Sequence, residues 1–271
     1  MPELPEVETI RRGVEPYVSG RRIEQVVVRD GRLRWPVPPN LPDYATGKRV
    51  RGVTRRGKYL IFDLGGDRLI VHLGMSGRLQ VLKRAAEPRK HDHLDIRLSG
   101  GITLRFHDPR RFGAVLPWPA DKPLHALLRD MGPEPFGDDF SGDYLFARSR
   151  GRRLPVKSFV MDGRIVVGVG NIYASEALFR AGIRPNRAAG RVGLAGWRRV
   201  IPAVRQVLDL AIKAGGTTLR DFAGAQGEAG YFQQELMVYG REGEGCRGCG
   251  TAIRRTVTGQ RSSFFCPRCQ S

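Results

Sequence analysis

The sequence predicts an α+β protein, in which an N-terminal β-sandwich or barrel-like domain with flanking helices precedes a helical domain and a four-cysteine ribbon. Short β-branched runs, separated by clusters of Gly, Pro and Asp, dominate residues 22–116. Helical periodicity replaces them beyond the Gly- and Pro-rich stretch at 132–139. All four cysteines lie between residues 246 and 269. Together these three observations favour two domains of different class and a metal-bound C-terminal ribbon.

The composition indicates a polyanionic partner. Of 271 residues, 46 are Lys or Arg and 27 are Asp or Glu, which gives a formal net charge of +19. A protein this basic usually binds a polyanion, and we favour nucleic acid over anionic lipid or a generic basic surface. Hydrophobic residues make up 41% of the chain, enough for a core. Because the sequence has no apolar run of about 18 residues and no apolar signal region near its start, we expect neither a membrane span nor secretion.

The first element is predicted to be a helix over residues 3–18. Its apolar side chains recur at helical spacing, and Pro2, Pro5 and the early glutamates suit a helix N-terminus. Eight strands are then expected at Ile23–Val28, Val50–Val53, Tyr59–Leu64, Leu69–Leu73, Leu79–Leu82, Leu94–Leu98, Ile102–Phe106 and Ala114–Leu116. Later helices are expected at Tyr144–Arg150, Val156–Met161, Ile172–Ala181 and Leu194–Ala214.

The cysteines have the spacing C-x2-C-x16-C-x2-C, at Cys246, Cys249, Cys266 and Cys269. Two Cys-x-x-Cys knuckles joined by a hairpin supply four thiolates for one tetrahedral Zn²⁺. We expect the hairpin over residues 253–265, with its turn near 259–260. Disulfides fit an intracellular chain poorly. Because so small a ribbon has almost no apolar core, metal binding must supply its folding energy.

Pro2 and Glu3 form the first candidate site. Removal of the initiator Met would leave Pro2 with a free secondary amine, and an α-amino group has a pKa near ~8, so a useful fraction is unprotonated at neutral pH. Such an amine can attack an electrophilic sugar carbon and form an imine-type intermediate, while Glu3 moves a proton. The alternative is that Pro2 simply starts the helix.

Two further candidates lie near strand ends. Lys58 precedes an apolar strand, where a lysine can act as a general acid or hold a phosphate, although it also fits an ordinary surface charge. Met75 lies between glycines in the segment 72–77. A methionine on an exposed tip can wedge into a base stack, and the alternative is a core filler.

The segments Lys90–His93 and Asp108–Gly113 interleave basic residues with an aromatic ring, a pattern that suits phosphates and stacked bases. Two histidines at i and i+2 could also bind a metal, and a polar loop is the third interpretation. The glycines of 167–173 precede a helix and suit either an anion-binding turn or a plain helix start. Tyr173 replaces the third glycine of a dinucleotide-binding motif and excludes that motif.

The remaining candidates lie near the C-terminus. The Gly-rich stretch 215–231 suits a loop that closes over a ligand, or a linker to the ribbon. Arg261 follows the predicted hairpin turn and could hold a phosphate, although Arg254 and Arg255 compete for that role.

In their order along the chain, these segments resemble those of bacterial formamidopyrimidine-DNA glycosylases, over residues 1–271. The segments that carry the resemblance are Met1–Thr9, His72–Gly77, Lys90–His93, Asp108–Gly113, Val167–Glu176 and the four-cysteine ribbon. The resemblance implies an N-terminal β-sandwich catalytic domain at 1–131, a linker and start of the helical domain at 132–150, a helix–two-turn–helix domain at 151–240 and a zinc hairpin at 241–271.

The resemblance also implies a function and its residues. The enzyme would excise oxidised purines, such as 8-oxoguanine and formamidopyrimidines, from double-stranded DNA and then cleave the strand by β,δ-elimination. By position, Pro2 matches the nucleophile that forms the Schiff base, Glu3 the general acid/base, Lys58 the lysine of β-elimination and Arg261 the arginine of δ-elimination. Matches to DNA-backbone contacts are His91, Arg110, Arg152, Lys157 and Asn171. Met75, Arg110 and Phe112 match the trio that fills the gap left by the flipped nucleotide, and residues 217–231 match the loop that covers the lesion base.

Two other functions stay open on the sequence. Endonuclease VIII, which acts on oxidised pyrimidines, shares the Pro-Glu start and the zinc hairpin, although Leu4–Thr9 and Asp108–Gly113 are more similar to the purine enzyme. A non-enzymatic zinc-ribbon DNA-binding protein would not need a processed Pro2. We expect a monomer with one structural Zn²⁺ and no membrane partner, in the bacterial cytoplasm.

Overall fold

The computed structural model describes residues 2–84, 86–216 and 235–271. The chain divides into two compact units. The first comprises the residues up to Arg129 and the short stretch that follows Lys213, and the second comprises Asp130–Lys213 and the C-terminal residues to Ser271. No helix among the described residues is long and apolar enough to cross a membrane.

The first unit is built on two antiparallel four-stranded sheets and helix α1 (Leu4–Val18). One sheet has the order β1-β6-β7-β5 and the other β2-β3-β4-β8. The strands are β1 (Ile23–Val28), β2 (Gly52–Arg56), β3 (Tyr59–Asp63), β4 (Arg68–His72), β5 (Arg78–Leu82), β6 (Asp92–Leu98), β7 (Ile102–His107) and β8 (Ala114–Trp118). Their inward-facing side chains form one hydrophobic core, so the unit is a sandwich and the predicted fold class is confirmed.

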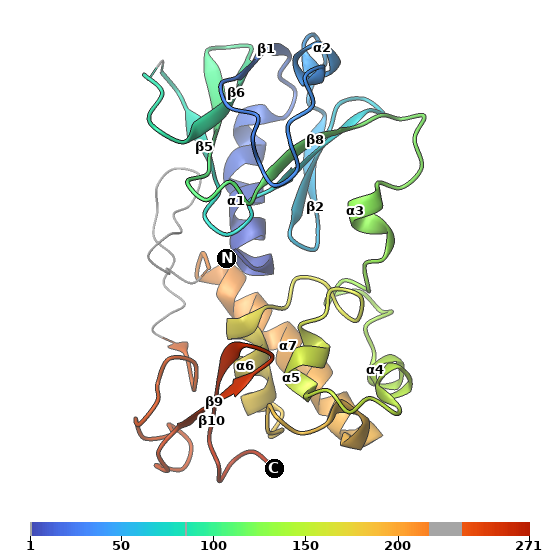
Figure 1. The fold of residues 1–271 in the computed structure, drawn as a ribbon, viewed down its shortest axis with the longest axis vertical. Helices are drawn as coiled ribbons and strands as arrows, with labels where there is room; N and C mark the ends of the chain where they lie inside the picture. Colours follow the sequence, from blue (N-terminus) through green and yellow to red (C-terminus); the bar gives the residue numbers. More distant parts are fainter. Residues whose placement is uncertain (1, 85, 217–234) are drawn as a thin grey trace. The chain divides into compact units, whose positions relative to one another are not determined.

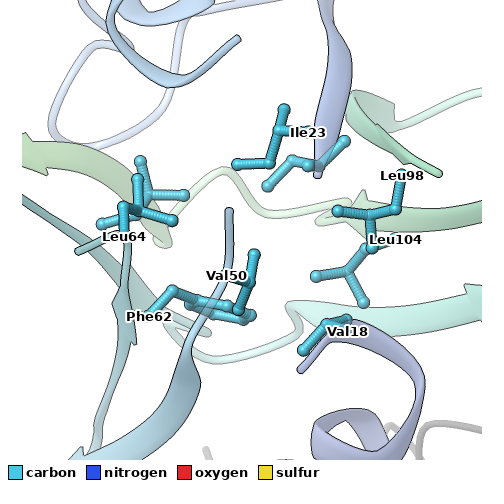
Figure 2. Close-up of a pocket in the computed structure, with 9 residues that line it drawn as sticks. Val18, Ile23, Val50, Phe62, Leu64, Leu98 and Leu104 are labelled. Atoms are coloured by element: carbon cyan, nitrogen blue, oxygen red, sulfur yellow. The ribbon is translucent and has the colours of Figure 1, made fainter. Parts of the chain in front are cut away.

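Helix α1 contacts both sheets, through β5 of one and β2 and β3 of the other (Figure 1). Its buried face carries Val7, Ile10, Val14 and Val18, as the helical spacing predicts. The core that these side chains join retains a small cavity of about 10 Å³, and its lining is entirely apolar (Figure 2). An apolar space of this size offers a ligand no polar partner, so it belongs to the packing of the core.

The strand predictions fail in detail at one hairpin. A strand was expected over Val50–Val53, but β2 begins at Gly52 and runs to Arg56. The reason is the tight turn at residues 57–58, which pairs Arg56 with Tyr59 and sets the register of β2 against β3. The short helices α2 (Leu41–Ala45) and α3 (Ala126–Arg129) were not predicted, because a single turn carries too little periodicity.

The second unit is helical, with a β-hairpin at its C-terminal end. Helices α4 (Gly142–Ser149) and α6 (Asn171–Arg180) pack against α7 (Leu194–Lys213). The unit also contains the short helices α5 (Val156–Val160) and η1 (Ala189–Arg191). The Trp197 indole N–H donates to Ser149 Oγ at 3.0 Å and ties α7 to the end of α4. A linker and the start of the helical domain are expected at 132–150. Within that stretch, residues 142–149 form α4 and are packed into this unit.

The hairpin consists of β9 (Arg254–Thr258) and β10 (Arg261–Phe265). Gly259 and Gln260 form its turn with φ of 55° and 62°, as the two central residues of a type I′ turn require. The ribbon shares a small hydrophobic core with α6, in which Val238 and Phe264 pack with Phe179. The expectation that the ribbon has almost no apolar core was therefore too strict, because α6 contributes side chains to it.

Candidate active site and nucleic-acid interface

Pro2 and Glu3 are buried at the start of α1. Glu3 is the N-cap residue and forms a capping box with Glu6. The Glu6 carboxylate accepts a hydrogen bond from the Glu3 backbone N–H at 2.9 Å. Glu3 is therefore held by the helix start, and Pro2 lies buried directly before it.

Lys58 occupies the turn between β2 and β3, after Gly57, whose φ of 57° suits the first position of a type II′ turn. His72 lies nearby, because strand pairing places it opposite Tyr59, the residue after Lys58. Burial is the main cause that lowers the pKa of His72, the charges of Lys58 and Arg34 add to it, and the pKa falls to about 4. His72 is therefore neutral at pH 7, and its Nδ1 accepts a hydrogen bond from the Gly74 backbone N–H at 3.2 Å.

Two loops of the first unit present the predicted gap-filling residues. Met75 and Phe112 are unusually exposed for large apolar side chains, at 37% and 39%. The Arg110 guanidinium lies over the Phe112 ring, with Cζ 5.0 Å from the ring centroid. The loops are in tight contact, since a Cβ on Gly74 would lie 2.4 Å from the Phe112 carbonyl carbon. The structure therefore brings these segments to one place and does not bury Met75 as a core filler.

The histidine pair of 90–93 is divided between two environments. His91 has a φ of 76°, and partial desolvation together with the charge of Lys90 lowers its pKa. His93 is buried, and its Nε2 bonds to the Asp108 carbonyl oxygen at 2.8 Å. In the part of the chain that the structure describes, the only cluster of metal-ligand side chains is the cysteine group. The alternative of a metal bound by His91 and His93 gains no support.

Sequence reasoning missed the residue at the centre of these loops. Asp108 is fully buried, and its carboxylate bonds to both loops, as detailed below. The only sequence signal is its place at the head of the Asp108–Gly113 segment.

In the second unit, Asn171 is the first residue of α6, and Gly170 is the N-cap. The Asn171 side-chain amide donates to the Tyr239 hydroxyl at 3.2 Å. Glu176, one helical turn further, is fully buried and accepts the backbone N–H groups of residues 237–239, each at 2.9 Å. Glu176 therefore fixes the segment that carries Tyr239, a role that sequence reasoning also missed.

Lys157 does not lie where the predicted DNA-backbone contact requires. It is 1% exposed, and its ammonium donates to the Ser262 carbonyl and to Ser263 Oγ, both at 2.8 Å. An ammonium buried against β10 anchors the hairpin and is not presented to a phosphate. Arg152, by contrast, is exposed in the loop between α4 and α5.

Arg261 is the first residue of β10 and is exposed beside the hairpin turn. Of the two competing arginines, Arg255 donates from Nε to Ser262 Oγ at 3.2 Å and approaches Glu242. Arg254 is exposed at the other end of β9. Position therefore favours Arg261 as the cation at the tip of the hairpin.

The four cysteine sulfurs lie within 4.8 Å of one another, with Sγ–Sγ distances of 4.0 Å for Cys246–Cys269 and 3.4 Å for Cys249–Cys266. Tetrahedral zinc with Zn–S bonds of about 2.3 Å requires sulfurs about 3.8 Å apart, so the cluster fits one Zn²⁺. Hydrogen bonding to its sulfur neighbours, Cys249 first, raises the pKa of Cys269 to about 12. Four thiolates this close ionise together only around a cation, which is the chemistry of a structural zinc site.

The stretch 217–231, expected to cover a lesion base, lies outside the described residues.

Comparison with known proteins covers the whole chain. Residues 1–115 match the formamidopyrimidine-DNA glycosylase N-terminal domain, residues 131–223 its H2TH domain, and residues 243–271 the zinc finger found in FPG and IleRS. The chain is 59% identical over 271 residues to the formamidopyrimidine-DNA glycosylase of Syntrophotalea carbinolica and 57% identical over 270 residues to that of Hahella chejuensis, with 100% of each chain covered.

Solved structures agree. The MutM (Fpg) protein of Thermus thermophilus superposes with a TM-score of 0.87 at 42% identity, covering 99% of this chain and 98% of that one. A glycine-to-proline variant of Lactococcus lactis Fpg, in complex with DNA containing Fapy-dG, gives a TM-score of 0.92 at 34% identity, with 100% of both chains covered. A further Lactococcus lactis Fpg complex contains abasic-site DNA and gives a TM-score of 0.90 at 34% identity, with 99% of both chains covered. From its N-terminal proline to its cysteine ribbon, this chain belongs to the formamidopyrimidine-DNA glycosylase family.

Proposed function

We propose that this protein is a bifunctional DNA glycosylase and AP lyase of base-excision repair, which removes oxidised purines and then cleaves the strand. The observation that carries the proposal is full-length family membership with Pro2-Glu3 built into the start of α1. Relatives of known structure were solved with Fapy-dG or abasic-site DNA. The substrate of this chain is accordingly double-stranded DNA. The protein binds it as a monomer and acts in the bacterial cytoplasm, where the DNA lies.

The chemistry begins at the N-terminus. The Pro2 nitrogen bonds to C1′ of the damaged nucleoside, and the glycosidic bond breaks with its electron pair on the leaving base. Glu3 supplies the proton that opens the deoxyribose ring and is available to take it back. The capping box serves this step, because the hydrogen bond from Glu3 N–H to Glu6 fixes the backbone next to the nucleophile.

Strand cleavage removes a proton from C2′ and breaks the C3′–O bond, then removes a proton from C4′ and breaks the C5′–O bond, so that each phosphate leaves with its electron pair. Lys58, held in its turn near the neutral His72, is the residue for β-elimination. Arg261, exposed beside the hairpin turn, is the residue for δ-elimination and phosphate contact. His91, Arg110, Arg152 and Asn171 contact the DNA backbone. Lys157 supports these contacts indirectly, by anchoring β10 through Ser262 and Ser263.

Base extrusion depends on Met75, Arg110 and Phe112. Taking a base out of the duplex costs a few kcal/mol, less for a damaged pair. Stacking of side chains in the gap offsets that cost by about 1–3 kcal/mol per good stack. The exposure of Met75 and Phe112 and the stacking of Arg110 on Phe112 support this role.

The first test is borohydride trapping on a duplex with one 8-oxoguanine opposite cytosine, followed by peptide mapping of the adduct. We expect a covalent adduct at Pro2, its loss in Pro2→Gly with DNA binding retained, and stalled base release in Glu3→Gln. Trapping with an oxidised pyrimidine alone would assign the protein the endonuclease VIII specificity. Tight binding with no adduct on either substrate would leave a non-enzymatic DNA-binding protein.

A further inference from the structure

We infer that Asp108 and Ser76 form a buried bridge that positions the loops of Met75, Arg110 and Phe112 for base extrusion. The inference rests on the proposed function, since it assigns positioning residues to the gap-filling step. Neither residue touches DNA in this role. Both act through the side chains that their loops carry.

The bridge joins the two loops through one carboxylate. Asp108 Oδ1 accepts the Ser76 hydroxyl at 2.7 Å, and Asp108 Oδ2 accepts the Gly113 backbone N–H at 2.8 Å. Ser76 Oγ accepts in turn the backbone N–H of Arg110 at 3.2 Å. The residue after Met75, the residue after Phe112 and the backbone of Arg110 are thus linked through two side chains.

The backbone of Asp108 extends the bridge to the histidine segment. Its N–H donates to the His91 carbonyl at 3.0 Å, and its carbonyl oxygen bonds to His93 Nε2 at 2.8 Å. Asp108 is 0% exposed and Ser76 8%. A buried carboxylate keeps its hydrogen bonds because an unpaired one is strongly destabilising, so the contacts persist in the free enzyme.

Backbone strain in two of the linked segments calls for such a restraint. Three non-glycine residues of the described chain have positive φ, and two of them, His91 and Arg111, lie in these segments at 76° and 58°. The side chains of Met75 and Phe112 are themselves exposed, so their position depends on the backbone of the loops that carry them. The bridge holds that backbone, so that Met75 and Phe112 enter the duplex without first paying the entropy of ordering two loops.

The test compares Ser76→Ala with a matched control, Ser99→Ala. The Ser99 hydroxyl accepts the Arg22 backbone N–H at an exposed site in another loop of the same unit, so Ser99→Ala reports the loss of a serine hydroxyl away from the bridge. Each variant is measured by single-turnover release of 8-oxoguanine, by 2-aminopurine fluorescence beside the lesion, and by borohydride trapping on a duplex with a pre-formed abasic site. The abasic substrate has no base to extrude and reports the Pro2 chemistry.

For Ser76→Ala we expect base release and the fluorescence change to slow about tenfold, with abasic-site trapping within twofold of wild type. Ser99→Ala should match wild type in all three. Asp108→Asn keeps an acceptor for the Gly113 N–H and a polar group facing Ser76. Its rate of base release should therefore fall less than that of Asp108→Ala. Circular dichroism and zinc content identify any variant that fails to fold. If Asp108→Ala fails to fold, Ser76→Ala alone decides the test.

Two results would overturn the bridge. One is extrusion at the wild-type rate in Ser76→Ala. The other is an equal loss of base release and abasic-site trapping, which would mean a general defect and no positioning role. If wild-type protein released no base from any lesion, the proposed function itself would fail, and that outcome is read from the wild type alone.

Discussion

At the scale of single residues, the electrostatics beside Lys58 are set by burial. His72, the last residue of β4, lies between the Tyr59 ring and the Met75 loop. The centroids of the His72 and Tyr59 rings are 4.6 Å apart. The His72 pKa of about 4 results first from desolvation and then from the charges of Lys58 and Arg34. A neutral imidazole at this place accepts a hydrogen bond from the loop and adds no positive charge next to the proposed β-elimination lysine.

His72 makes stability depend on pH. In the unfolded chain its pKa is near ~6.5 and in the folded protein about 4, so the unfolded state binds more protons between these values. The free energy of unfolding therefore falls as the pH drops from about 6.5 towards 4, by about 2 kcal/mol at pH 5.

The measurement is urea unfolding of wild type and His72→Asn at pH 7.5 and 5. Asparagine can accept a hydrogen bond from the Gly74 N–H but does not titrate. Between pH 7.5 and 5, the free energy of unfolding of wild type should therefore fall by about 2 kcal/mol relative to that of His72→Asn. An unchanged difference would show that His72 is protonated in the folded protein as easily as in the unfolded one.

At the scale of elements, two loops carry the proposed gap-filling residues and a hairpin carries Arg261, and the loops and the hairpin are fixed in different ways. The loops are fixed by close backbone approach and by the Asp108 carboxylate. The hairpin is fixed by its zinc site, by the Phe179 contact of its core and by the Lys157 ammonium. The contrast predicts different responses to substitution.

Gly74 is the test position for the loops. Its φ is 62°, and an added Cβ would lie 2.4 Å from the Phe112 carbonyl carbon, so Gly74→Ala combines backbone strain with a clash. Gly101 has a φ of 73° and open space, so Gly101→Ala adds strain alone, about 1–2 kcal/mol. We expect Gly74→Ala to lower the free energy of unfolding in urea by at least about 2 kcal/mol more than Gly101→Ala does. It should also slow base release at least tenfold. Equal stability of the two variants would mean that the loops separate freely.

Zinc is the test for the hairpin. Chelation or Cys249→Ser should remove the metal and unfold the ribbon, because metal binding supplies much of its folding energy. With the tip that carries Arg261 lost, affinity for abasic-site DNA should fall at least tenfold, while the sandwich stays folded by circular dichroism. Added Zn²⁺ should restore binding to the chelated wild type and not to Cys249→Ser. Unchanged affinity after complete loss of zinc would contradict this role of the ribbon.

At the scale of the whole molecule, the net charge of +19 governs the search for damage. Sequence-independent attraction to phosphates gives non-specific affinity and allows sliding along the duplex. If about four cationic side chains lie on phosphates, a rise from 50 to 200 mM salt lowers the binding constant about 100-fold. Fluorescence anisotropy on undamaged duplex measures this slope, and a flat binding constant would count against electrostatic DNA binding.

The sequence by itself determined what depends on local pattern. Helical spacing located α1, strand-like runs located most strands of the sandwich, and the cysteine spacing identified the zinc ligands. The Pro2-Glu3 start and the order of the motifs were enough for the family. These features are local because periodicity, turn chemistry and ligand spacing are each encoded within a few residues.

Only the tertiary structure decided which side chains meet. Ser76 and Asp108 are 32 positions apart, and Lys157 and Ser263 are 106 apart, so neither pair has a signal in local sequence. Their contacts depend on strand register and on the packing of a hairpin against a helix, which are settled by the core as a whole. That is why Lys157 was predicted at a phosphate but is buried against β10, and why the sequence assigns Asp108 no role.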